Sequence, residues 1–168
     1  KNLNLNGLLE VIWEAHRYGI ASELNLLLGA PLLNIEEQIQ DTLNSIKWAM
    51  KNCPKDTTCV LFPINIKKNT LLYYLFEDGQ YELISHWEFI EMLSRIPKEY
   101  LGRISIAWWG NRFNIYEGRT TIIYPHSCDK CHDELQGFYE AFYTGDEAKK
   151  IEILMEIATF ECDCKKEF

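Results

Sequence analysis

Apolar residues near the start of the chain follow a helical period and then close up into a short continuous run. The helical positions lie three or four residues apart: Leu5, Leu8, Leu9, Ile12 and Ala15. Gly19 suits the end of that helix, because glycine tolerates the left-handed backbone that often follows a helix. The next run, residues 20–29, reads IASELNLLLG and is typical of a buried parallel strand.

A second helix is predicted directly after this strand. Asn34, followed three residues later by Glu37, is a capping-box pattern that marks a helix N-terminus. The apolar positions that follow form one stripe along the helix: Ile35, Ile39, Leu43, Ile46 and Met50. Together with the preceding strand, this helix makes an α/β unit.

The same order of elements then repeats. Residues 58–66 are dense in β-branched and aromatic side chains and predict a strand, which a loop carrying Asp78-Gly79 follows. Ser85 with Glu88 is a second capping-box pattern, and Pro97 stops the helix that it opens. Because strands and helices alternate, the sequence predicts an α/β fold with parallel strands.

The pattern changes after this third helix. The remaining elements are predicted as strands at 103–111 and 119–125 and helices at about 133–143 and 146–160. We therefore divide the chain into an α/β part at 1–97 and a smaller α+β tail at 98–168, which carries two close-set cysteine pairs.

Composition places the chain among globular proteins. It has 168 residues, 47% hydrophobic and 13% aromatic, enough for one core or a domain with an appendage. No apolar run approaches the roughly twenty residues of a membrane span, and no signal peptide is indicated. We expect a cytoplasmic protein without a membrane partner, and we interpret the start at Lys1, without methionine, as a sign of a fragment or processed piece.

The net charge of the chain bears on whether it binds nucleic acid. A formal net charge of -8 argues against a free-standing nucleic-acid-binding protein, because phosphate binding needs clustered Lys and Arg. The adjacent basic pairs, at 67–68, 149–150 and 165–166, are typical of solvated surface. Contact with nucleic acid would need a local patch.

The strongest chemical signal is a set of four cysteines in two pairs, Cys128 with Cys131 and Cys162 with Cys164. A CxxC pair lets both sulfurs converge on one metal ion, and a CxC pair does the same with a tighter chain. The two helices predicted between the pairs would bring four thiolates to one end of a hairpin. The pattern predicts a closed zinc site or an iron–sulfur cluster site, and spacing does not choose between them.

Other interpretations of the cysteines stay open. Disulfides would suit a secreted protein, which nothing in the sequence indicates. The first pair precedes a predicted helix, as a redox CxxC pair does, and buried free thiols also occur as packing groups. His126 and His132 bracket the first pair and are interpreted as neighbours of the site or surface groups, and Cys53 and Cys59 as structural residues.

Residues 16–49, HRYGIASELNLLLGAPLLNIEEQIQDTLNSIKWA, carry three motifs in order: His-x-x-Gly-Ile at a helix end, Gly-x-Pro after a strand, and a helix rich in Glu and Gln. In this order the chain resembles the radical S-adenosylmethionine enzymes, in the branch of the Elongator catalytic subunit and the archaeosine synthase radical component. Residues 61–93 continue the resemblance with Lys-x-x-Thr-Leu and Gly-x-Tyr. WWGN at 108–111, a cysteine pair and a terminal CxC are most similar to the archaeosine-synthase group.

The resemblance covers nearly the whole chain but only the latter half of such an enzyme. It implies the C-terminal part of a partial TIM barrel followed by a small cysteine-rich α+β tail, with strand C-terminal ends facing the active site. The family's CxxxCxxC loop, which holds the [4Fe-4S] cluster that cleaves S-adenosylmethionine, is absent from this sequence, as are the early strands. A missing N-terminal half is therefore the implied partner.

By position, the resemblance also implies residues that would line the cofactor's ribose and adenine. They are Asn25, Leu27, Gly29, Phe62, Pro63 and Ile64. An amide inside an apolar strand requires a hydrogen-bonding partner, which for Asn25 is either the cofactor or neighbouring backbone. For Leu27, core packing is the competing interpretation. The Trp108-Trp109 pair fits either a stacking platform for a nucleobase or an anchor for the tail.

Two functional hypotheses follow. In the first, the chain is the C-terminal portion of a radical S-adenosylmethionine enzyme, with RNA as the candidate substrate, and it is not catalytic alone. In the second, it is a zinc-stabilised, non-catalytic interaction domain. Under the first hypothesis an open half barrel would expose a sheet edge and an apolar face, so the isolated piece is expected to be unstable or to associate.

Overall fold

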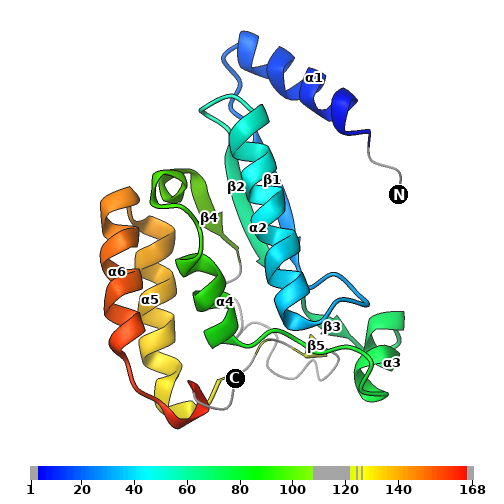
Figure 1. Cartoon of the computed structure of the whole chain (residues 1–168), viewed down its shortest axis with the longest axis vertical. Coiled ribbons are helices and arrows are strands. Elements are labelled where there is room, and N and C mark those ends of the chain that lie inside the picture. Colours follow the sequence, from blue (N-terminus) through cyan, green and yellow to red (C-terminus); the bar gives the residue numbers. More distant parts are fainter. Residues whose placement is uncertain (1–3, 108–121, 124, 126, 166–168) are drawn as a thin grey trace.

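Three parallel strands form the centre of the fold (Figure 1). They are β1 (Glu23–Leu28), β2 (Thr58–Pro63) and β4 (Ile104–Ile106), in the order β1-β2-β4. The computed structural model describes residues 4–107, 122–123, 125 and 127–165. The mixed α/β class predicted from the sequence is confirmed, and the sheet is a small one. Closure into a partial TIM barrel stays a prediction.

The two faces of this sheet differ sharply in burial. Successive side chains of a strand point to opposite faces, so one face carries Leu26 paired with Leu61 and the other carries Leu27 paired with Phe62. Leu61 is fully buried, whereas Leu27 is 66% exposed. The strand at 20–29 was predicted to be buried, and this is wrong for β1, because alternate positions of β1 face away from the helices. We call the surface of Asn25, Leu27, Val60, Phe62 and Ser105 the open face.

Helices cover the opposite face of the sheet. α2 (Ile35–Asn52) lies along β1 and begins at Asn34, whose side chain accepts from the Glu37 N–H in the predicted capping box. α4 (His86–Ser94) begins at Ser85 with a second capping box and buries most of its residues. Pro97 ends this region and opens a short 3-10 helix at Lys98–Arg103. These local signals were predicted correctly.

α1 (Leu5–Arg17) is attached at the N-terminal end of β1 (Figure 1). Ile12 is its buried residue, and the Trp13 indole N–H donates to the Asn52 carbonyl at 3.0 Å. Gly19 has a φ of 72°, as expected for the predicted end of this helix.

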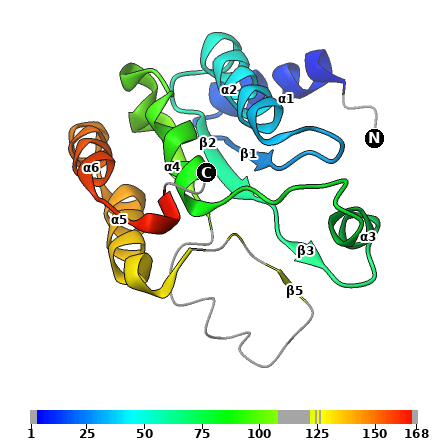
Figure 2. The ribbon, with the colours of Figure 1, turned by 60° about the horizontal axis from the view of Figure 1, so that its bottom comes forward.

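A small second unit lies beyond the C-terminal ends of β1 and β2 (Figures 1 and 2). The strand predicted at 58–66 stops at Pro63, and Ile66–Lys67 forms a separate strand, β3, antiparallel to β5 (Ile122–Ile123). α3 (Leu71–Glu77), capped by Thr70, occupies part of what was predicted as a loop. Buried Ile66, Tyr81 and Leu83 form its core.

The tail forms a helical hairpin that packs on the sheet. Its helices are α5 (His132–Thr144) and α6 (Glu147–Thr159), close to the predicted ranges. β4 pairs with β2 and α5 packs on β4, so the sheet and the buried core both run across residue 97. The division into domains at that residue stays a prediction. Within the described ranges, no helix combines the length and apolarity needed to cross a membrane.

Candidate metal centre

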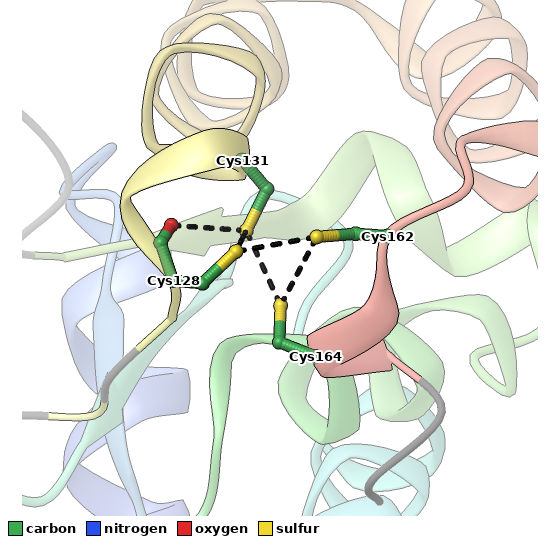
Figure 3. A group of neighbouring side chains, drawn as sticks. All are labelled: Cys128, Cys131, Cys162 and Cys164. Carbon is green, nitrogen blue, oxygen red and sulfur yellow. Dashed lines mark hydrogen bonds between the residues drawn. The ribbon is translucent and has the colours of Figure 1, made fainter.

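The helical hairpin brings the two cysteine pairs together at one end (Figure 3). Cys128 and Cys131 precede α5 on a 3-10 turn, and Cys162 and Cys164 follow α6 on another. Sulfur–sulfur distances are 3.6 Å within the first pair and 3.4 Å within the second. Across the pairs, Cys128 lies 3.2 Å from Cys162, and Cys131 lies 3.5 Å from Cys164.

This geometry was tested against a single metal ion. A tetrahedral zinc site with bonds of about 2.3 Å separates its sulfurs by about 3.8 Å. All four Sγ atoms lie within 4.8 Å of one another, so their spacing fits a four-coordinate ion with modest adjustment. All four cysteines are free, and none is paired in a disulfide. The structure therefore assembles the four residues that the sequence predicted as ligands into a group that could bind a metal.

The four thiols sit in different electrostatic surroundings. Burial and the neighbouring sulfurs raise the pKa of Cys131 to about 12, and a hydrogen bond with Cys128 raises the pKa of Cys162. Burial also opposes ionisation of Cys164, but hydrogen bonds from the Cys128 backbone and the Trp87 indole outweigh it and lower its pKa to about 6. Metal binding at this centre therefore has to displace protons, and binding must strengthen as pH rises.

One neighbour of the centre was missed by sequence reasoning. Trp87 in the first turn of α4 donates its indole N–H to the Cys164 sulfur at 3.2 Å, and the two residues lie 77 positions apart. No local pattern signals a contact across such a separation. His132, which the sequence placed beside the centre, is exposed, and His126 lies outside the described residues.

The two remaining cysteines lie elsewhere. Cys53 and Cys59 are buried members of the main core, at the end of α2 and within β2. Burial raises the pKa of Cys59 to about 11, so this thiol stays protonated and behaves as an apolar packing group. This environment suits the structural role predicted for both.

Three of the predicted cofactor-lining residues share the open face. Asn25, Leu27 and Phe62 occupy neighbouring positions on β1 and β2, with Leu27 directly beside Phe62. Asn25 is exposed, so water can satisfy its amide. In this chain by itself, the Asn25 amide therefore requires neither a protein nor a cofactor partner.

The other three lie at the strand ends: Gly29 follows β1, Pro63 is the last residue of β2, and Ile64 comes next. Gly29 has a φ of 119° and is enclosed, because a Cβ there would collide with Ile64 and Tyr81. The Tyr81 hydroxyl donates to the Gly29 carbonyl at 2.9 Å, and the Ile64 N–H donates to the Leu28 carbonyl at 2.8 Å. Proline has no N–H, and the Ile64 N–H already donates to Leu28, so the backbone of Pro63 and Ile64 offers only carbonyl oxygens to a ligand.

The four-cysteine group and the strand ends lie at the same end of the molecule. α5 starts and α6 finishes at the end toward which the three parallel strands point (Figures 1 and 2). The Trp108-Trp109 pair, predicted as a stacking platform or an anchor for the tail, lies outside the described residues.

Comparison with known proteins gives a distant likeness. No protein-family model matches the chain, and no solved structure matches it. Among curated proteins, it is similar to archaeosine synthase subunit beta of Methanosarcina acetivorans. The two are 24% identical over 156 residues, which is 90% of this chain but only 39% of the relative. The chain thus spans about two fifths of that protein's length, and the match supports the resemblance drawn from the motifs at the level of the broad group.

Proposed function

We propose that this chain is the C-terminal portion of a cytoplasmic radical S-adenosylmethionine enzyme that modifies RNA, and that it is not catalytic alone. The observation that carries the proposal is Leu27, which is 66% exposed on the open face of the sheet, opposite the helices. Such a surface is what the inside of an incomplete barrel would present. The likeness to archaeosine synthase subunit beta supports the same assignment.

In this proposal the missing N-terminal half closes over the open face and brings the CxxxCxxC loop. Its [4Fe-4S] cluster, when bound, supplies the chemistry that cleaves S-adenosylmethionine. This chain contributes the wall of the cofactor site: Leu27 and Phe62 offer apolar surface to the adenine, and Asn25 offers an amide to the ribose. Gly29 lets the backbone turn tightly where the strand ends, and the carbonyls of Pro63 and Ile64 accept hydrogen bonds from the adenine.

In this proposal the four cysteines bind one zinc ion, which stabilises the tail by joining the start of α5 to the end of α6. The compact spacing, with all sulfurs within 4.8 Å, favours a single ion, because a four-iron cluster would have to spread the sulfurs around a body of several atoms. An auxiliary iron–sulfur cluster is the competing occupant. Measurement of iron and sulfide separates the two.

A second candidate function is a zinc-stabilised interaction domain without catalysis. It is favoured by one observation, that all four candidate ligands come from this chain, so the metal centre needs no partner. The two candidate functions predict different sequences ahead of Lys1. The enzyme requires an N-terminal half that packs on the open face, whereas the interaction domain does not.

The test is to read the coding sequence ahead of Lys1 and to express the complete polypeptide without oxygen. We expect a CxxxCxxC motif upstream and reductive cleavage of S-adenosylmethionine by the complete polypeptide, with none by the 168-residue chain. An independent start codon at this point, or a complete polypeptide that carries the cluster but does not cleave S-adenosylmethionine, would contradict the proposal.

A further inference from the structure

From the contact between α4 and the CxC turn, we infer that Trp87 is a positioning residue of the metal centre, whose indole N–H fixes the Cys164 sulfur and withdraws charge from it. This inference rests on the metal centre proposed above. The donor nitrogen lies 3.2 Å from the sulfur, and Trp87 is only 5% exposed. Because water is largely excluded, this hydrogen bond is stronger than it would be at the surface.

The indole is held in place from several sides. Trp87 lies in the first turn of α4, inside the capping box that Ser85 forms with Glu88. The Phe160 ring stacks on the indole, with centroids 5.9 Å apart and an interplanar angle of 18°. The orientation of the N–H is therefore set by packing before a metal arrives.

Lys165, next to Cys164 in the sequence, also contacts the indole. Its Nζ lies 5.2 Å from the centroid of the Trp87 ring. The same Nζ donates to the carbonyls of Ala158 at 2.9 Å and Phe160 at 3.0 Å, at the end of α6. Phe160 before the CxC pair and Lys165 after it thus both contact the indole, which couples the position of Trp87 to the turn that presents Cys164.

This contact also joins the metal centre to the body of the fold. α4 packs with α2 and α6, and its Phe89 and Met92 are fully buried in the main core. Cys164 is thereby tied to the sheet side of the molecule, whereas Cys128 and Cys131 belong to the hairpin. A residue that orients a ligand in this way usually changes metal affinity by about 10- to 100-fold when it is replaced.

The experiment loads the full chain with Co²⁺ and compares it with Trp87→Phe, which keeps an aromatic ring but lacks the N–H. We expect the sulfur-to-cobalt charge-transfer band of the variant to move to longer wavelength, because an unbonded thiolate gives up electron density more easily. We also expect its Co²⁺ dissociation constant to rise about tenfold.

Two controls separate this role from packing. Trp13→Phe removes an indole N–H that donates to the distant Asn52 carbonyl, and Phe160→Leu loosens the stack but keeps the Trp87 N–H. Trp13→Phe should leave the band in place, and Phe160→Leu should move it less than Trp87→Phe does. An unchanged band in Trp87→Phe, or an equal shift in Phe160→Leu, would overturn the inference.

If Trp87→Phe fails to fold, the wild-type chain loaded with ¹¹³Cd decides the matter. An indole proton that is scalar-coupled to ¹¹³Cd and close to the Phe160 ring supports the inference, and no such coupling overturns it. A wild-type chain that binds neither Co²⁺ nor Cd²⁺ would instead contradict the metal centre itself, so the two failures can be told apart.

Discussion

Leu27 and Phe62 lie side by side on neighbouring parallel strands, on the face of the sheet opposite the helices. Leu27 is 66% exposed there, although its neighbours in β1 are Leu26 and the buried Leu28. An apolar side chain as exposed as Leu27 is typical of a surface on which another segment packs. In the proposed enzyme, the missing half of the barrel and its cofactor pack on this surface.

The substitution Leu27→Asp should therefore act differently in the two contexts. In the isolated chain the side chain is largely exposed, so the free energy of unfolding should change by less than about 0.5 kcal/mol. In the complete polypeptide the carboxylate would be buried against the other half, and we expect a loss of several kcal/mol together with loss of S-adenosylmethionine binding. Urea unfolding and equilibrium dialysis measure the two effects.

Met155→Asp is the matched control, because Met155 is 65% exposed on α6 of the tail, away from the open face. It should leave both contexts unchanged. A Leu27→Asp variant that is as stable as wild type in the complete polypeptide would argue that nothing closes over the open face.

Replacing Cys131 with Ser should remove the metal and loosen the tail. Cys131 is fully buried and belongs to the four-sulfur group, and structural metal binding is coupled to folding. We expect hydrogen exchange of α5 and α6 to accelerate, while the amides of α2 keep their protection. Cys53→Ala, at a buried cysteine outside the group, should keep the full metal content. Equal metal content in the Cys131→Ser variant would count against the site.

Gly29→Ala should destabilise the chain by about 2–4 kcal/mol, because the added Cβ collides with Ile64 and Tyr81 at a strained positive φ. Gly137→Ala is a good comparison, since Gly137 lies in α5 with open space around it. That change should stabilise the helix by about 0.5–1 kcal/mol. Chemical unfolding of both variants checks the pair, and equal effects would show that Gly29 has no special backbone role.

Lys150 gives a prediction about pH. Its Nζ is buried and donates to the Ile104 carbonyl at 2.7 Å and the Leu101 carbonyl at 3.3 Å. Burial lowers the pKa of Lys150 below 10.5, its value in the unfolded chain. At a pH between the pKa of the folded state and that of the unfolded state, the unfolded chain therefore binds more protons. The contribution of Lys150 to the free energy of unfolding must therefore increase as the pH rises between these two pKa values.

The check is to measure the free energy of unfolding of wild type and Lys150→Met at about pH 7.5 and about pH 10. Comparing the two proteins cancels the other groups that titrate in this range. The difference should shift in favour of wild type at the higher pH. A constant difference would mean that the pKa of Lys150 is the same in the folded and unfolded chain.

Local signals predicted much of the fold. The capping boxes at Asn34 and Ser85 and the spacing of the four cysteines each depend on residues close in sequence, and the structure confirms the helix starts and the clustering of the sulfurs. α3 was missed because its run of Leu, Tyr and Phe after Thr70 buries no residue fully and leaves Leu71 74% exposed. Because the run is apolar almost throughout, it shows neither the polar face of an amphipathic helix nor the alternation of a strand, although Leu72, Leu75 and Phe76 pack on one core.

Features that depend on distant partners could not be read from the sequence. The break after Pro63 arises because Ile66 pairs with Ile123, far along the chain. The exposure of Leu27 depends on which strands lie beside β1, and the contact of Trp87 with Cys164 depends on how α4 meets the hairpin. In each case tertiary packing, and not local propensity, decides the outcome.

The most direct test of the metal centre, which anchors this account, is elemental analysis of the chain purified without oxygen. One zinc per chain, with neither iron nor acid-labile sulfide, is the predicted result, because the four sulfurs are spaced for a single ion. A metal-free chain that still melts cooperatively would contradict the centre. Iron and sulfide in equal amounts would show that the four cysteines hold an auxiliary iron–sulfur cluster and not a zinc ion.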